Sequence, residues 1–193
     1  MYFVLRYINN IYCLYKKVCY NCPNMEIMPE IQKRISVRNF KDIAIKQDVI
    51  SRVLEAGQLA PSAKNRQPWR FLVIDNPELK KKIQEASYGQ EHIGKSGVII
   101  LACSTNIEYE MPNGQQSYPI DISFAVSFMM LQAEHEGLGS CVITTYDEEE
   151  IKSLVSVPYS MRVVMMLLLG YTDEHLIVRD RQQIKRIFAF NHW

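Results

Sequence analysis

The spacing of apolar residues along this chain predicts helices in some segments and strands in others. Apolar side chains at every third or fourth position indicate amphipathic helices, whereas short β-branched and aromatic runs bounded by turn residues indicate strands. Pro29 followed by Glu30 suits a first helical turn. The helices expected are residues 29–34, 48–60, 78–87, 120–135 and 147–155, and the strands expected are residues 69–75, 98–103, 141–144 and 162–170.

Two of these segments are apolar on every side. Residues 162–170 (RVVMMLLLG) form a near-continuous apolar run, which predicts a central strand covered on both faces. Residues 120–135 carry apolar groups around nearly the whole helix circumference. Such a helix needs cover that one small domain can hardly supply, so we expect a second subunit to contribute. A central helix buried within a monomer is the alternative.

The order of elements predicts an α+β fold. Helices interleave with strands without strict alternation, which favours layers around a central mixed β-sheet flanked by helices. With 193 residues and 48% hydrophobic content, one domain is expected over residues 25–193. Residues 1–24 lack this periodicity and are interpreted as an extension outside the fold. Polar and basic residues interrupt them too often for a membrane span, and a surface-seeking amphipathic helix is the alternative.

Charge and cysteine content exclude several classes of protein. A net charge of +1 argues against binding to nucleic acid by bulk electrostatics. Five irregularly spaced cysteines do not form a secreted disulfide framework, so we expect a cytoplasmic protein. Cys19 and Cys22, with Cys13 nearby, lack the fourth ligand of a structural zinc site.

Residues 89–96 (GQEHIGKS) match the phosphate-binding pattern G-x-x-x-x-G-K-[ST]. A P-loop requires a strand before the glycines and a helix after them. Here the expected order is helix then strand, and we interpret the match as a helix-to-strand loop. A P-loop phosphotransferase therefore remains an unfavoured alternative.

Arginines at a spacing of two provide a candidate anion site. In an extended chain Arg34, Ser36 and Arg38 point the same way, and in a helix Arg34 and Arg38 are neighbours. Two guanidiniums with a hydroxyl between them suit a phosphate or carboxylate, although solvated surface arginines would give the same pattern. Arg179 and Arg181 repeat the spacing near the C-terminus and are candidates to close the same pocket.

No constellation of catalytic side chains is evident. The four histidines show no metal-ligand spacing and no nucleophile elbow, and Glu148, Glu149 and Glu150 are interpreted as a solvated helix start. The polar loop over residues 60–69 (APSAKNRQPW) carries hydroxyl and amide groups between two prolines, which suits hydrogen bonding to a heterocycle. An ordinary helix-to-strand connection is the alternative. Any reactive group is therefore expected to be a cofactor.

These segments resemble the nitroreductase family of flavin enzymes. The stretches that carry the resemblance come in the family's order, and they are RISVRNF (residues 34–40), APSAKNRQPWRF (60–71), EGLGSC (136–141) and LGY (169–171), followed by the arginines at 179 and 181. The resemblance covers nearly all of the chain from about Met28. It implies a nitroreductase-like three-layer fold in a domain-swapped-type homodimer, with FMN at each of two sites in the interface.

The resemblance also implies roles for individual residues. Arg34, Ser36 and Arg38 would hold the phosphate and the polar flavin edge, joined by Arg181 and Arg179. The loop residues Pro61, Ser62 and Asn65 would come from the partner subunit. The backbone around Ile143, Thr144 and Thr145 would lie beside the reactive ring, and Gln90 is a further candidate for contact with the flavin.

The implied activity is that of an NAD(P)H-dependent flavin oxidoreductase. NADH or NADPH would reduce FMN, and a small oxidant such as a nitroaromatic or quinone would then take the same place. The alternative is a flavin-binding or ligand-binding module without turnover. The segment between Ser104 and Ser117 is shorter than in the longer family members, so the substrate pocket is left undefined by the resemblance.

Overall fold

The computed structural model describes residues 27–175 and 180–192. The chain divides into two units, residues 1–32 and 33–193. The described part of the first unit includes most of the short helix α2 (Pro29–Lys33), in which no residue is buried. The predicted extension over residues 1–24, with its three cysteines, lies outside the described residues.

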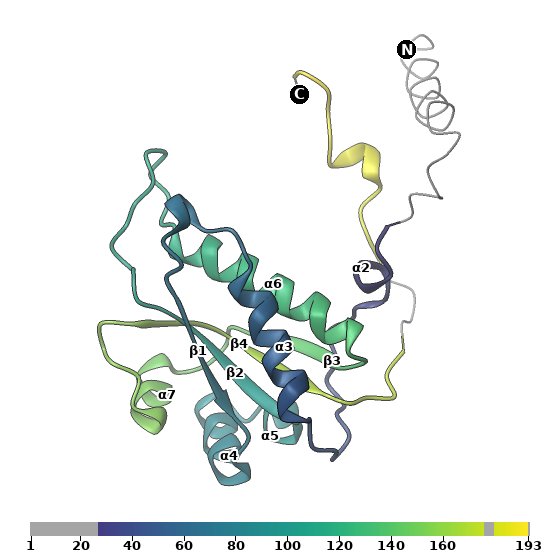
Figure 1. Ribbon diagram of the computed structural model, residues 1–193, viewed down its shortest axis with the longest axis vertical. Coiled ribbons are helices and arrows are strands. Elements are labelled where there is room, and N and C mark those ends of the chain that lie inside the picture. Colours follow the sequence, from purple (N-terminus) through teal and green to yellow (C-terminus); the bar gives the residue numbers. More distant parts are fainter. Residues whose placement is uncertain (1–26, 176–179, 193) are drawn as a thin grey trace. The chain divides into compact units, whose positions relative to one another are not determined.

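The second unit contains a sheet of four strands (Figure 1). The strands are β1 (Trp69–Ile74), β2 (Val98–Ser104), β3 (Gly139–Ile143) and β4 (Arg162–Gly170), and their spatial order is β1-β2-β4-β3. All three neighbouring pairs are antiparallel. The mixed pairing expected from the sequence is limited to one isolated parallel bridge, between Ser36 and Ser140 at the β3 edge. Strands that run parallel to each other, β2 with β3 and β1 with β4, do not pair, because in each case another strand lies between them.

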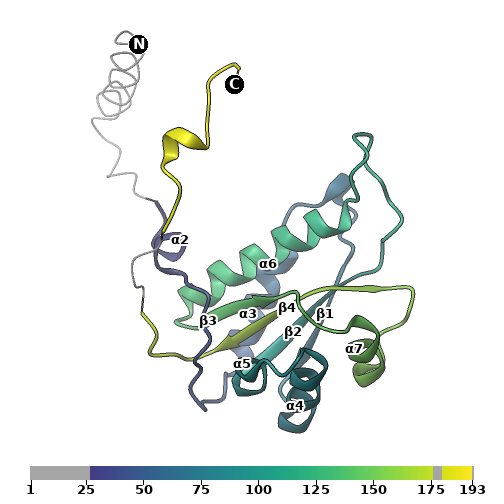
Figure 2. The same cartoon turned by 180° about the vertical axis from the view of Figure 1, so that it is seen from behind.

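Helices cover both faces of this sheet, which confirms the three-layer α+β arrangement. Helices α3 (Gln47–Gln58) and α6 (Tyr118–His135) cover one face. On the other face lie α4 (Pro77–Ala86), α5 (Glu91–Lys95) and α7 (Glu148–Val155), as Figure 2 shows from behind. Two hydrophobic clusters result, one on each side of the sheet. Every residue of β2 is buried, as expected of a central strand.

Local signals place the helix ends close to the predicted ones. Asn76 begins α4 by accepting a hydrogen bond from the N–H of Leu79 at 2.9 Å, and Asp147 does the same for Glu150 at 3.0 Å before α7. The short helix α5 was expected as a loop, since five residues interrupted by a glycine give no periodic signal. Two short 3₁₀ turns, η1 (Ala63–Asn65) and η2 (Ile184–Arg186), were also not expected.

The interpretation of Glu148 as a solvated residue was wrong. Its carboxylate is half-buried, forms ion pairs with Lys152 at 2.9 Å and Arg162 at 2.8 Å, and accepts a hydrogen bond from the N–H of Val163 at 3.0 Å. Burial raises its pKa, but these donors outweigh burial and leave the pKa below its ordinary value. Glu148 therefore joins α7 to the start of β4.

A buried lysine ties α4 to the segment before β2. Lys80 Nζ donates to the carbonyl of Ser96 at 2.5 Å and to that of Gly97 at 3.3 Å. Burial lowers the pKa of Lys80, while Asp42 and Asp75 act in the opposite direction. Among the described residues, no helix combines the length and the apolarity needed to cross a lipid bilayer.

Candidate functional site

The segment over residues 34–38 lies along the edge of the sheet in an extended conformation. Ser36 forms a parallel bridge with Ser140 of β3, and the N–H of Val37 donates to the carbonyl of Ser140 at 2.9 Å. Val37 is buried and Ile35 packs against the same cluster. Successive side chains of an extended chain alternate, so Arg34, Ser36 and Arg38 project from the opposite side. We call these three residues the arginine row.

Electrostatics shows that the two guanidiniums of the arginine row act on the same place. Burial raises the pKa of the Cys141 thiol in β3, whereas Arg38 and Arg34 both lower it. Arg38 also lowers the pKa of His92, in addition to the larger effect of burial. Positive charge from Arg34 and Arg38 therefore reaches Cys141, where Glu174 opposes it, and charge from Arg38 also reaches His92 in α5.

The end of β3 meets the start of α5. Gln90 Nε2 donates to the carbonyl of Thr145 at 3.0 Å and to that of Ser87 at 3.0 Å. Ladder pairing of β3 ends at Ile143, so the backbone of Thr144 and Thr145 continues beyond the sheet. The structure thus brings Gln90 to the backbone of Thr145, just beyond the end of the strand along which the arginine row lies. Whether Arg34, Ser36 and Arg38 act together with these groups stays a prediction.

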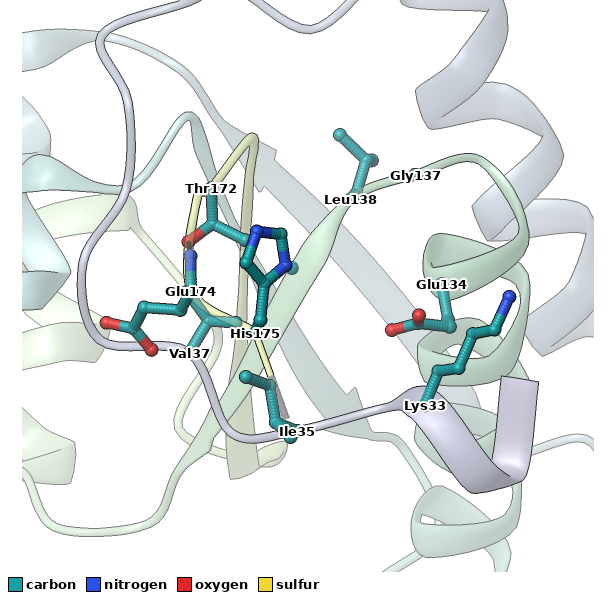
Figure 3. Close-up of a pocket in the computed structure, with 10 residues that line it drawn as sticks. Lys33, Ile35, Val37, Glu134, Gly137, Leu138, Thr172, Glu174 and His175 are labelled. Atoms are coloured by element: carbon teal, nitrogen blue, oxygen red, sulfur yellow. Dashed lines mark hydrogen bonds between the residues drawn. The ribbon is translucent and has the colours of Figure 1, made fainter. Parts of the chain in front are cut away.

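A pocket of about 290 Å³ lies on the other side of the same segment. Figure 3 shows Lys33 and Glu134 on one side of it, and Thr172, Glu174 and His175 on the other. Ile35 and Val37 line this pocket, so by alternation the arginine row faces away from it. The pocket is therefore distinct from the surface that the arginine row forms.

The loop with Pro61, Ser62 and Asn65 is held at the first turn of α6. Asp121 Oδ1 accepts a hydrogen bond from the N–H of Ala63 at 2.8 Å, and Ser62 Oγ accepts one from the N–H of Gln67 at 3.0 Å. Pro61 and Asn65 are exposed and Ser62 is half-buried. We call residues 61–68 the proline loop.

Within one chain, the proline loop and the arginine row lie at opposite ends of α6. The loop binds the N-terminal turn of α6, whereas the C-terminal end of α6 leads through Gly137 and Leu138 into β3, along which the row runs. Helix α6 has 18 residues, which at roughly 1.5 Å per residue separates its ends by about 27 Å. A single chain does not bring the two groups of predicted residues together.

The outer face of α6 carries large exposed apolar side chains. Ile120, Phe124 and Phe128 follow one another at helical spacing and are 36%, 46% and 40% exposed. Helix α6 packs with its other side on α3 and the sheet. The expectation that this helix needs cover from outside the chain agrees with this exposed face.

The C-terminal arginines are only partly described. Arg181 is exposed, and its Nη1 donates to the carbonyl of Asp180 at 2.9 Å. Arg179 lies outside the described residues. The convergence of these two residues with the arginine row stays a prediction.

The match to a P-loop is not a phosphate site. Lys95 forms an ion pair with Glu91 at 2.7 Å, and Ser96 is buried with its Oγ donating to the carbonyl of Ile93 at 2.8 Å. The segment forms α5 and then enters β2, so no helix N-terminus follows the lysine. Among the described residues no group of His, Cys, Asp or Glu side chains has metal-site geometry.

Comparison with known proteins shows the family. The nitroreductase family model matches residues 31–91 and 87–171. The chain is 24% identical over 196 residues to an NADH dehydrogenase of Thermus thermophilus, in an alignment that covers 86% of this chain and 96% of that protein. It is 26% identical over 173 residues to an FMN reductase [NAD(P)H] of Bacillus subtilis, which covers 81% of this chain and 70% of that protein.

A solved structure supports the same assignment. The nitroreductase family protein of Clostridium novyi NT superposes with a TM-score of 0.72 and 32% sequence identity, covering 77% of this chain and 87% of the other. The chain described here belongs to the nitroreductase family. The resemblance drawn from the sequence motifs is thereby confirmed, together with the fold class.

Proposed function

We propose that this protein is an FMN-dependent oxidoreductase that takes hydride from NADH or NADPH and reduces small oxidants such as nitroaromatics or quinones. The observation that carries the proposal is the arginine row, which pairs with β3 in a member of the nitroreductase family. Gln90, which contacts the backbone of Thr145 after the same strand, supports it. The names of related proteins support both the flavin and the nicotinamide donor.

The side chains present suit FMN. Two guanidiniums and the exposed Ser36 hydroxyl supply directed donors for a phosphate dianion. Gln90 uses its Nε2 to donate to two carbonyls, which leaves its oxygen as an acceptor for a ring N–H. These groups bind and orient a ligand, and none of them is a nucleophile or a paired general base.

The chemistry that FMN supplies when bound is hydride transfer, from the nicotinamide and then to the oxidant. Arg34, Ser36 and Arg38 would hold the phosphate and the polar edge of FMN, with Arg181 and Arg179 as further candidates to join them. The backbone N–H groups around Ile143, Thr144 and Thr145 would lie beside the bound flavin and tune its electron affinity. No catalytic side chain is assigned.

We further propose that the active form is a homodimer with two flavin sites in its interface. The arginine row of one subunit and the partner's copy of the proline loop, with Pro61, Ser62 and Asn65, together enclose each flavin. Two observations support this: the separation of the two groups along α6, and the exposed phenylalanines on its outer face. The described cysteines, Cys103 and Cys141, are unpaired and buried, which suits a cytoplasmic protein.

A spectrum of the purified protein tests the proposed function. We expect a yellow protein with flavin absorbance that bleaches on anaerobic addition of NADH or NADPH and returns when an oxidant is added. A yellow protein that neither donor bleaches would instead be a flavin-binding module without turnover. A protein that stays colourless after incubation with FMN would refute the assignment of the arginine row.

A further inference from the structure

An aromatic ring and two cations meet where the proline loop touches the next loop of the chain. The guanidinium Cζ of Arg66 lies 3.5 Å from the centroid of the Tyr109 ring, and Lys64 Nζ lies 5.5 Å from the same centroid. Pro68 holds the proline loop against the segment after β2, because its carbonyl accepts hydrogen bonds from both the N–H and the Oγ1 of Thr105, at 2.9 and 3.1 Å. We call Lys64, Arg66 and Tyr109 the cation cluster.

The segment that carries Tyr109 is a short hairpin. Glu110 and Gln116 form an antiparallel bridge, and the N–H of Met111 donates to the carbonyl of Gln115 at 2.8 Å. The hairpin turns at Gly114, where φ is +81°. It occupies the region between β2 and α6 for which the sequence defined no substrate pocket.

The backbone of the proline loop is strained at the cation cluster. Lys64, Asn65 and Gln67 have φ values of 53°, 54° and 49°, in the left-handed region that favours glycine. Such strain persists only where the surrounding structure enforces it, and it concentrates at ligand-binding sites. Here the enforcing contacts are those of Asp121 with Ala63 and of Ser62 with Gln67. The strained loop therefore fixes the directions in which Lys64 and Arg66 project.

The two cations of the cluster have no anionic partner among the described residues. Neither forms an ion pair, although Glu108 and Glu110 flank Tyr109 in the sequence. By contrast, Arg52, Lys95 and Arg162 all pair with carboxylates. An anion that pairs with both cations would relieve their mutual repulsion.

The geometry points to a ligand that is both flat and anionic. A guanidinium stacked on a ring keeps the N–H groups of its edge available, and those groups match a carboxylate at two points. Arg66 already covers one face of the Tyr109 ring, so the half-buried ring offers an aromatic ligand its remaining exposed surface. Lys64 and Arg66 are also two and four residues from Ser62, which we assign to the flavin site.

We propose that the cation cluster selects small aromatic oxidants that carry a carboxylate. This inference rests on the proposed function, because the cluster acts on the oxidant that receives hydride from the flavin. Lys64 and Arg66 bind the carboxylate, Tyr109 packs against the aromatic ring, and the reducible group is directed toward the flavin. Nitrobenzoates are substrates of this class.

Equilibrium binding tests the cluster without relying on turnover. Calorimetric titration with benzoate and with its neutral isostere benzamide measures the preference for the carboxylate. We expect benzoate to bind about tenfold more tightly, as for the loss of one charge-assisted hydrogen bond. The variant Lys64→Gln/Arg66→Gln should reduce this preference to less than about twofold. The control Lys81→Gln/Lys82→Gln removes two exposed charges from α4, on the other side of the sheet, and should keep it.

Tyr109→Leu provides a second variant that leaves both cations in place. This variant should weaken the binding of benzoate and of benzamide by the same factor, since both ligands lose the contact with the Tyr109 ring. Equal binding of benzoate and benzamide to the wild-type protein would overturn the inference, and so would a preference that survives in Lys64→Gln/Arg66→Gln. Flavin content and circular dichroism check that each variant is folded.

The donor is the other possible source of an anion, through the 2′-phosphate of NADPH. Rates of flavin reduction by NADPH and NADH separate the two sources. If Lys64→Gln/Arg66→Gln loses a preference for NADPH over NADH while its preference for benzoate is unchanged, the cation cluster binds the 2′-phosphate of the donor and our inference is wrong. A wild-type protein that contains no flavin, or whose flavin neither donor reduces, would contradict the proposed function and not the role of the cation cluster. In that case the calorimetric comparison of benzoate and benzamide still tests whether the cation cluster binds a carboxylate.

Discussion

The exposed face of α6 gives the sharpest test of the shared site. Changing Phe124 and Phe128 to serine removes two rings that are 46% and 40% exposed in the isolated chain. A phenylalanine side chain offers roughly 200 Å² of surface, so the two rings leave about 170 Å² uncovered in each subunit. Burying this area in both subunits at about 25 cal/mol per Å² contributes roughly 8 kcal/mol to association.

That contribution is comparable with the cost of association, which is about 4–15 kcal/mol. We therefore expect Phe124→Ser/Phe128→Ser to be a folded monomer at micromolar concentration, as measured by analytical ultracentrifugation. Because the proline loop of the partner is then absent, we also expect flavin to be lost although the arginine row is unchanged. Absorbance in the visible range measures the flavin content.

The control for this variant is Tyr159→Ser. Tyr159 is an aromatic residue 77% exposed before β4, and its loss should leave both assembly and flavin content unchanged. A monomeric Phe124→Ser/Phe128→Ser protein with one flavin per chain would refute the shared site. A variant that remains a dimer would show that the interface lies elsewhere.

Three further variants test the arginine row, the buried Lys80 and the half-buried carboxylate of Glu148. Arg34→Ala/Arg38→Ala should give a folded but colourless protein, and full flavin content by visible absorbance would show that the anion site is misplaced. Burial holds the pKa of Lys80 in the folded protein below its ordinary value of 10.5. Between the pKa of the folded protein and that of the unfolded chain, the unfolded chain binds more protons, so stability rises with pH in this range. Lys80→Met should remove that rise in melting temperature. Glu148→Gln should lower the free energy of unfolding by about 2 kcal/mol in chemical denaturation, whereas Glu149→Gln at an exposed position should not.

Apolar periodicity and continuous apolar runs predicted the elements that bury a large part of their surface. Helices α3, α4 and α6 and strands β2 and β4 were expected within a few residues of their ends, because each presents an apolar pattern long enough to be recognised. Helix α5 has five residues, of which only Ile93 is buried, and gives no such pattern. The role of Glu148 was missed because its partner Arg162 lies 14 residues further along, across a turn.

In the candidate site, too, features set by neighbouring residues in the sequence were predicted, and features set by contacts with distant segments were not. The extended alternative for residues 34–38 was open in the sequence, and pairing with β3 decided it. The spacing of Arg34, Ser36 and Arg38 therefore became informative only after the strand was placed. The left-handed conformations of Lys64 and Gln67 had no local signal and that of Asn65 only a weak one, because contacts with Asp121 of α6 and with Ser62 impose them.

The length of α6 has a genetic consequence. In the proposed dimer each chain lends its proline loop to one site and its arginine row to the other, so every site draws on two copies of the gene product. A chain with the arginine row destroyed and a chain with the proline loop destroyed are each inactive alone. Mixed in one dimer they restore one intact site of two, so co-expression of the two defective alleles should recover activity through interallelic complementation.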